Sequence, residues 1–234
     1  MKKLQCAMLL LVALTVSNLR ASEALKANPA VFDFGTIREG QHAPVRFSVT
    51  NAGTKSIAIR EIRTFAACIE SKPAPMQTLK PGATLDLGYV FASLGYGGVR
   101  VDKKIEIHYN DSDVLTLRVT GQVLALEKYQ APPGELAYNF FALVDIRPKK
   151  DFVSEHILGA IHVPEEKLFR WADSIAGSLS GDLVIYLCCG DGQRSDVCAL
   201  QLRNKGYQQF VSLVGGLKEW KIQQNEKWLI PGEH

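Results

Sequence analysis

The sequence predicts two domains of different fold class, an all-β sandwich followed by an α/β domain with a mostly parallel sheet. Two observations predict this division. Between residues 30 and 123, apolar and polar residues alternate with a period of two, as half-buried strands require. After residue 135, short apolar runs alternate with helical segments, which is typical of parallel strands joined by helices on both faces of the sheet.

The alternation in the first domain is clearest in Val99–Tyr109 and is repeated in Leu115–Val119. Turn sequences such as Lys80-Pro81-Gly82 separate such runs, and no useful helical stretch interrupts them. Residues 25–126 are therefore predicted to form a sandwich of about seven strands.

Residues 127–135 contain two prolines and a glycine, and this composition predicts a short stiff linker. The second domain is expected over residues 136–234, and the chain is long enough for both domains. The clearest elements predicted in it are two helices, Glu165–Ala176 and Ser195–Lys205, and a strand, Asp182–Cys188.

Residues 1–24 are predicted to be a signal peptide, with cleavage near residue 21 or 24. Two lysines precede an apolar run that is too short to span a bilayer, and small residues follow it. An uncleaved anchor is the alternative. No later segment is apolar enough to span, so the mature chain is expected in the periplasm or outside the cell, without a stable membrane span.

The charge distribution argues against nucleic acid as a partner. Of the 27 basic residues, Lys2, Lys3 and Arg20 lie in the first 21 positions, which leaves 24 basic residues against 24 acidic ones. No basic stripe is present. Export would place the later cysteines in an oxidising setting, but three of these four crowd into eleven residues, which is unlike a disulfide framework.

A glycine-containing loop follows the apolar run LVIY and starts at Cys189. It lies between the predicted strand and the next helix, where sites form in α/β sheets. The positive end of that helix and the charge of Arg194 favour a thiolate at Cys189. Gly190 and Gly192 let the backbone amides converge on an anion. This loop suits nucleophilic attack by sulfur and storage of a charged sulfur adduct.

The loop Cys189–Ser195 resembles the active-site loop of the rhodanese family, Cys-x-x-Gly-x-Arg-Ser. Four residues separate its cysteine from its arginine, one fewer than in cysteine phosphatases, and the shorter loop suits a persulfide sulfur. The resemblance extends from Tyr138 to Gln224. Its further motifs are Asp145-Ile146-Arg147, His156-Ile157-Leu158-Gly159-Ala160-Ile161, and Gly215-Gly216 followed by Trp220.

This resemblance implies an exported rhodanese-type sulfurtransferase that carries sulfane sulfur as a persulfide on Cys189. The implied donor is thiosulfate or a thiol persulfide, and the implied acceptor is a thiol or cyanide. Asp145 and Arg147 are implied to support the site, and Arg194 either acts directly or braces the loop. The predicted anion-binding loop consists of Gly190, Asp191, Gly192, Gln193, Arg194 and Ser195.

Asp191 departs from the basic loops that favour thiosulfate in this family. A carboxylate beside the nucleophile repels a dianion, so we hypothesise that a thiol persulfide is the better donor.

The first domain resembles domain of unknown function 1573, a bacterial immunoglobulin-like family. Val31–Ile37 contains the motif Phe-Asp-Phe-Gly-x-Ile, and Thr50–Gly53 matches the family's Thr-Asn-x-Gly turn. Relatives show two close cysteines after the third strand, whereas this chain has only Cys68, which is predicted to be a free thiol. The domain is interpreted as a binding or spacing module, and binding would engage a protein partner.

Several alternatives stay open. A catalytically inactive rhodanese fold that binds partners is the main one. Thiol–disulfide exchange between Cys189 and Cys198 is another. Otherwise Cys188 and Cys198 are predicted to be buried thiols, since a vicinal Cys188–Cys189 disulfide would be strained. His156 is predicted to bond backbone and Trp220 to cover the core. The spacing of potential ligands predicts no metal site, and no cofactor is implied.

Overall fold

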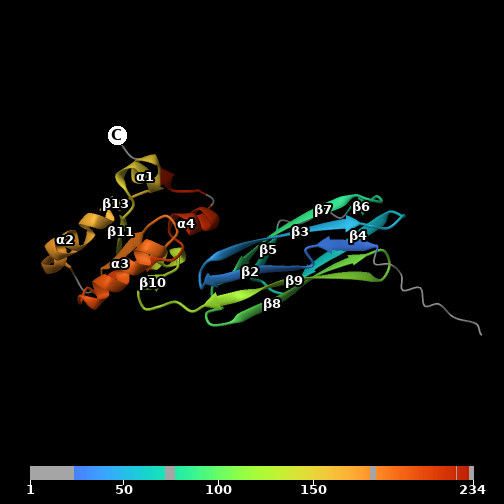
Figure 1. The fold of residues 1–234 in the computed structure, drawn as a ribbon, viewed down its shortest axis with the longest axis horizontal. Helices are drawn as coiled ribbons and strands as arrows, with labels where there is room; N and C mark the ends of the chain where they lie inside the picture. The colour runs from blue at the N-terminus through green and yellow to red at the C-terminus, as the bar shows by residue number, and fades with distance from the viewer. Residues whose placement is uncertain (1–23, 72–76, 180–182, 225, 232–234) are drawn as a thin grey trace, which may run out of the picture.

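The computed structural model describes residues 24–71, 77–179, 183–224 and 226–231, which form two domains arranged end to end (Figure 1). The predicted signal peptide lies outside the described residues, apart from residue 24. In the part of the chain that is described, no helix is long and apolar enough to cross a membrane.

Two sheets form the N-terminal domain. Their strands are β1 (Leu25–Asn28), β2 (Val31–Arg38), β3 (His42–Asn51), β4 (Ile57–Thr64), β5 (Ile69–Ser71), β6 (Thr78–Leu79), β7 (Thr84–Ala92), β8 (Arg100–Tyr109) and β9 (Asp113–Leu124). One sheet has the order β1-β3-β7-β5, and the other has the order β2-β9-β8-β4-β6. The described residues contain more strands than the seven or so predicted, because a strand of two residues such as β6 is too short to show alternation in the sequence.

Side chains from both sheets share one hydrophobic core. The ring of Phe34 on β2 stacks on that of Phe91 on β7, with centroids 5.0 Å apart. Along β8, Ile105 and Ile107 are fully buried, which confirms the predicted alternation there. Val99 differs, because it precedes β8 and is 45% exposed.

The C-terminal domain is built on a parallel sheet of order β10-β15-β14-β11-β13. A separate antiparallel pair joins β12 to β16. The elements are β10 (Gln130–Ala131), the 3-10 helix η1 (Pro133–Tyr138), β11 (Phe141–Asp145), α1 (Lys149–Ser154), β12 (His156–Ile157), β13 (Ile161–His162), α2 (Glu165–Ile175), the 3-10 helix η2 (Ala176–Ser178), β14 (Val184–Cys188), α3 (Gln193–Asn204), β15 (Phe210–Leu213), α4 (Gly216–Gln224) and β16 (Leu229–Ile230).

Successive side chains of β14 enter two different clusters. Ile185 and Leu187 pack with side chains of α2 and α3, whereas Tyr186 and Cys188 pack with side chains of η1 and α4. Because neighbouring residues of a strand point to opposite faces, Cys188 and the following Cys189 also fall into separate clusters.

The predicted linker, residues 127–135, is not a free spacer. Gln130 and Ala131 form β10, pair with β15, and are 7% and 2% exposed. The amides of Ser212 and Val214 donate to the carbonyls of Tyr129 and Ala131 at 2.7 and 2.9 Å. Part of the segment is thus an edge strand, because the backbone groups around β10 gain partners on β15 that composition alone does not reveal.

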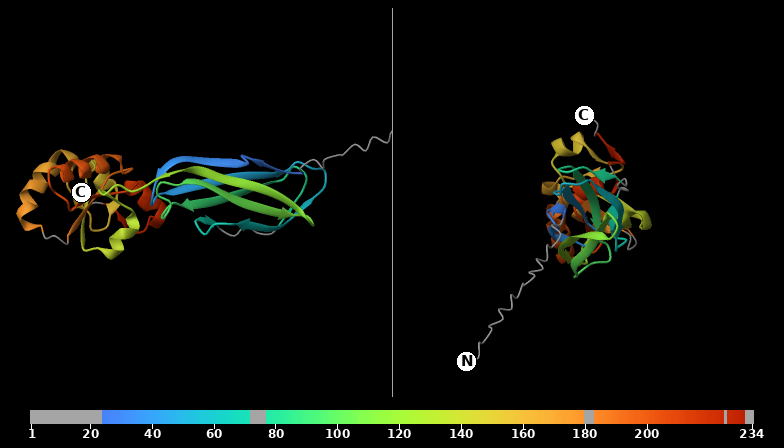
Figure 2. Two further views of the ribbon diagram at one scale, coloured as in Figure 1. Left: turned by 90° about the horizontal axis from the view of Figure 1, so that it is seen from below. Right: turned by 90° about the vertical axis from the view of Figure 1, so that its right-hand side faces the viewer.

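The end of the N-terminal domain formed by the β2–β3 turn faces α4 of the C-terminal domain (Figures 1 and 2). Gln223 on α4 donates from Nε2 to the carbonyl of Gly40 at 2.9 Å. His42 at the start of β3 bonds Glu219 on the same helix. The two domains therefore meet beside the loop that follows β14.

Candidate functional site

Cys189 lies at the carboxyl end of β14, immediately before the turn that begins α3. Gly192 precedes this helix with φ of 88°, a left-handed conformation that favours glycine. A Cβ atom there would also lie 2.6 Å from the backbone nitrogen of Gly215. Both constraints explain why residue 192 is a glycine. The helix α3 that follows begins at Gln193, two residues before the predicted start at Ser195.

The sulfur of Cys189 accepts a hydrogen bond from the backbone N–H of Gly192 at 3.2 Å. The Oγ of Ser195 lies 3.5 Å from the same sulfur and donates to the carbonyl of Gly192 at 3.0 Å. Ser212 on β15 in turn donates to that Oγ at 2.9 Å. Because the Ser195 hydroxyl donates its proton to the Gly192 carbonyl, its oxygen can accept a hydrogen bond from the Cys189 thiol. The bonds among Ser212, Ser195 and Cys189 therefore fix the position of the sulfur.

Asp191 occupies the turn between Cys189 and the helix. Its Oδ1 accepts the backbone N–H of Gln193 at 3.1 Å and lies 3.9 Å from the Cys189 sulfur. Of the amides expected to converge on the sulfur, that of Gly192 thus reaches it, whereas that of Gln193 bonds the carboxylate. The negative charge of Asp191 is held next to the thiol.

A cavity of about 330 Å³ opens beside the thiol. Cys189 is only 2% exposed as a residue and contributes to the wall of this cavity. The lining residues are Ile146, Arg147, Pro148, Asp151, Cys189, Gly190, Asp191 and Arg194.

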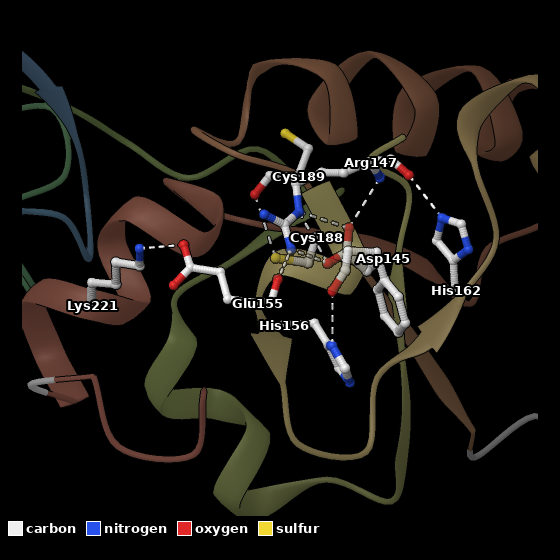
Figure 3. Close-up of polar contacts among 9 residues, drawn as sticks. Asp145, Arg147, Glu155, His156, His162, Cys188, Cys189 and Lys221 are labelled. Carbon is white, nitrogen blue, oxygen red and sulfur yellow. Dashed lines mark hydrogen bonds and ion pairs between the residues drawn. The ribbon is translucent and has the colours of Figure 1, made fainter. Parts of the chain in front are cut away.

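The two arginines of this cavity both pair with carboxylates. Arg194 forms an ion pair with Glu165 at the start of α2, so its guanidinium ties the loop to that helix. Arg147 donates from Nε to both carboxylate oxygens of Asp145 at 3.0 and 3.1 Å, and from Nη2 at 2.8 Å. A further bond from Nη2 reaches the Glu155 carbonyl at 2.5 Å (Figure 3).

Asp145 thus holds Arg147, which is part of the cavity wall. Asp145 is 1% exposed, and burial by itself opposes the charge on Arg147, but the bonds and the charge of Asp145 raise the pKa of Arg147. The carbonyl of Arg147 also accepts from Nε2 of His162 at 2.9 Å. The pair therefore fixes the turn that leads to α1.

The other cysteines of this region are buried and free. Burial raises the pKa of Cys188 well above its usual value, and the charge of Asp145 adds to this effect. Burial likewise raises the pKa of Cys198 to about 11. The prediction of buried thiols is confirmed for both residues, and Figure 3 shows the sulfur atoms of Cys188 and Cys189 on opposite sides of the strand end.

Two further predictions are confirmed. His156 donates from Nδ1 to the carbonyl of Phe152 at 3.0 Å and stacks on its ring, so it is a structural histidine. Trp220 on α4 is 8% exposed within the core and donates from Nε1 to the Lys227 carbonyl at 3.0 Å. Cys68 is a half-buried free thiol.

Three contributors to the site had no individual signal in the sequence. Ser212 reaches Ser195 from β15, and Glu165 holds Arg194 from α2. Gly216 packs so closely that its Cβ would lie 2.3 Å from the Cys189 carbonyl, although its Gly-Gly motif was part of the resemblance. Across the described residues, no group of three or more histidines, cysteines and carboxylates is placed to hold a metal ion.

Fold and loop together define a two-domain protein with a cysteine site at the end of a parallel sheet. Residues 126–223 match the family model of the rhodanese-like domain, and residues 25–123 match that of a protein of unknown function, DUF1573. The chain therefore joins a DUF1573 domain to a rhodanese-like domain, in the predicted order.

Curated relatives match about a third of the chain. The adenylyltransferase and sulfurtransferase UBA4 of Candida albicans is 34% identical over 89 residues, 36% of this chain and 20% of that protein. The thiosulfate sulfurtransferase GlpE of Coxiella burnetii is 28% identical over 79 residues, 34% of this chain and 70% of that protein. The chain spans 20% of the length of UBA4, and 40% and 63% of the lengths of two Bacillus subtilis relatives, YrkF and YqhL. These similarities support a sulfur-transfer role.

Among solved structures, the PapD-like domain 7 of human CEP192 is 12% identical, with a TM-score of 0.39. That match covers 54% of this chain and 100% of the other.

We predict that Gly192→Ala destabilises the protein by about 1–3 kcal/mol, because alanine is strained in the left-handed conformation. Urea unfolding of the two variants measures this loss. Gly190→Ala is the matched control, since its Cβ meets no atom within 4 Å and its φ is not left-handed, and it should change stability by less than about 0.5 kcal/mol. Equal losses in both variants would contradict the account of the turn.

We predict that Cys198 stays protonated in the folded protein until the pH approaches its raised pKa of about 11. At about pH 8, iodoacetamide should therefore modify Cys198 at least about tenfold more slowly than Cys68, as measured by peptide mass mapping. In denatured protein the two rates should be similar. A Cys189–Cys198 disulfide in oxidised protein, or equal labelling in folded protein, would instead favour thiol–disulfide exchange.

Proposed function

We propose that the protein is a sulfurtransferase that carries sulfane sulfur as a persulfide on Cys189. The observation that supports this most is the Gly192 N–H bonded to the Cys189 sulfur at the start of α3, beside a cavity. A helix N-terminus and a backbone amide both stabilise negative charge on sulfur. The rhodanese-like domain match supports the same chemistry.

In the first half-reaction, the Cys189 thiolate attacks the outer sulfur of the donor. The donor's S–S bond breaks, and sulfite or a thiolate leaves with the bonding electron pair, while Cys189 gains one sulfur. In the second, an acceptor thiolate or cyanide attacks that terminal sulfur, and the Cys189 thiolate leaves. The sulfane sulfur only changes partner, so the cycle requires no external oxidant or reductant.

The charges in the cavity favour a thiol persulfide over thiosulfate as donor. Arg147 and Arg194 are each paired with a carboxylate, whereas Asp191 lies 3.9 Å from the sulfur. A dianion entering the cavity therefore meets a carboxylate near the nucleophile and no unpaired arginine among the lining residues.

The alternative is a non-catalytic adaptor, which the low exposure of Cys189 favours.

We also propose that the protein is exported, with a signal peptide at residues 1–24. For the fold, we propose an immunoglobulin-like sandwich in the N-terminal domain and helices on both faces of the parallel sheet. The two lysines and the apolar run near the N-terminus support export. N-terminal sequencing of the mature protein tests it, and an intact residue 1 would refute cleavage.

We predict that treatment with a persulfide donor adds one sulfur atom to the protein, and that cyanide or a thiol removes it. Intact-mass analysis measures both steps. Cys189→Ser should lose the addition completely, whereas Cys198→Ser should retain it. Absence of the added sulfur in the unmodified chain, with several donors, would support the adaptor instead.

We predict that Asp191→Asn raises turnover with thiosulfate about three- to tenfold relative to a thiol persulfide. Two unit charges about 4 Å apart interact by ~1 kcal/mol in water, and asparagine removes this repulsion while keeping an oxygen for the Gln193 amide. Steady-state rates with both donors give the ratio. Glu166→Gln removes a carboxylate that does not line the cavity and should leave the ratio of the two rates unchanged. An unaltered ratio in Asp191→Asn would contradict the explanation by charge.

A further inference from the structure

We propose that the N-terminal domain helps to position the Cys189 loop through the buried carboxylate of Glu219. In this view Glu219 is a positioning residue, and His42 of the other domain is its partner. The inference rests on the proposed function for its kinetic readout only. It assigns to the DUF1573 domain a direct role in shaping the site of the rhodanese-like domain.

Glu219 is 2% exposed, although it is charged and lies on α4. Its Oε1 accepts two hydrogen bonds from His42, one from the backbone N–H at 3.0 Å and one from Nδ1–H of the imidazole ring at 2.8 Å. Gln223 adds a bond from Nε2 at 2.9 Å. A buried carboxylate is costly without such donors. Two of the three come from the N-terminal domain, so the carboxylate is satisfied by a contact between domains.

The first turn of α4 also holds the backbone of the Cys189 loop. The amide of Leu217 donates to the Cys189 carbonyl at 2.9 Å, and the amide of Lys218 donates to the Gly190 carbonyl at 2.9 Å. Glu219 is the next residue of the same turn, and its own amide donates to the Gly215 carbonyl at 3.1 Å. The helix end that supports the loop is therefore the one that Glu219 attaches to the other domain.

Close packing continues this connection to the sulfur. A Cβ on Gly215 would lie 3.1 Å from Nε2 of Gln41, and one on Gly192 would lie 2.6 Å from the nitrogen of Gly215. Gly192 supplies the amide that bonds the Cys189 sulfur. The β2–β3 turn, α4 and the cysteine loop thus form one series of contacts, and α4 lies at the domain junction in two views (Figures 1 and 2).

His42→Ala is the most informative variant, because it removes the ring contact without changing any residue of the rhodanese-like domain. We expect the rate of Cys189 persulfide formation to fall about three- to tenfold with little change in KM. The rate of Cys189 alkylation by iodoacetamide at a fixed pH should fall by a similar factor, since a displaced Gly192 amide stabilises the reacting thiolate less. Glu219→Ala should act similarly, whereas Glu219→Gln keeps an acceptor and should retain most activity.

The double variant His42→Ala with Glu219→Ala should be no slower than Glu219→Ala alone, because both changes remove one contact. Lys221→Ala is the matched control, since Lys221 on α4 pairs with Glu155 from within the same domain (Figure 3). It should leave the rate of persulfide formation and the rate of Cys189 alkylation unchanged.

Unchanged rates of persulfide formation and of alkylation in both His42→Ala and Glu219→Ala would overturn the inference. Additive effects in the double variant, or an equal effect of Lys221→Ala, would overturn it too. If even the unmodified chain forms no persulfide, the proposed function fails. The Cys189 alkylation rates of the same variants at a fixed pH then still test the coupling between the domains.

Discussion

The structure of the site depends on one hydrogen bond, from the backbone N–H of Gly192 to the sulfur of Cys189. It forms because the chain turns sharply between β14 and α3, and only a glycine meets both the left-handed backbone and the close approach of Gly215. The same turn brings the sulfur to the positive end of α3. Local backbone geometry therefore places a backbone amide and a helix N-terminus beside the sulfur.

This geometry is supported from several directions. Arg194 ties the loop to α2, Ser212 reaches it from β15 through Ser195, and the first turn of α4 bonds its carbonyls. Glu219 connects that last support to the N-terminal domain. The two domains meet where the reactive loop is built, so the junction and the site form a single structural unit.

Features that depend on residues close together in the chain could be predicted from the sequence. Alternating residues such as Ile105 and Ile107 revealed the strands, and the spacing of glycines around Cys189 revealed the loop and the following helix. Contacts between distant residues left no such signal. His42 and Glu219 are 177 positions apart, and β10 becomes a strand only because β15 offers its edge. Composition therefore predicted a linker where tertiary pairing makes a strand.

The central claim is that the Gly192 amide donates to the Cys189 sulfur, and NMR of the intact protein tests it most directly. In Cys189→Ala the Gly192 amide loses its acceptor, so its proton resonance should move upfield and its exchange with solvent should become faster than in the unmodified protein. The same Gly192 resonance and the same exchange rate in both proteins would contradict the hydrogen bond.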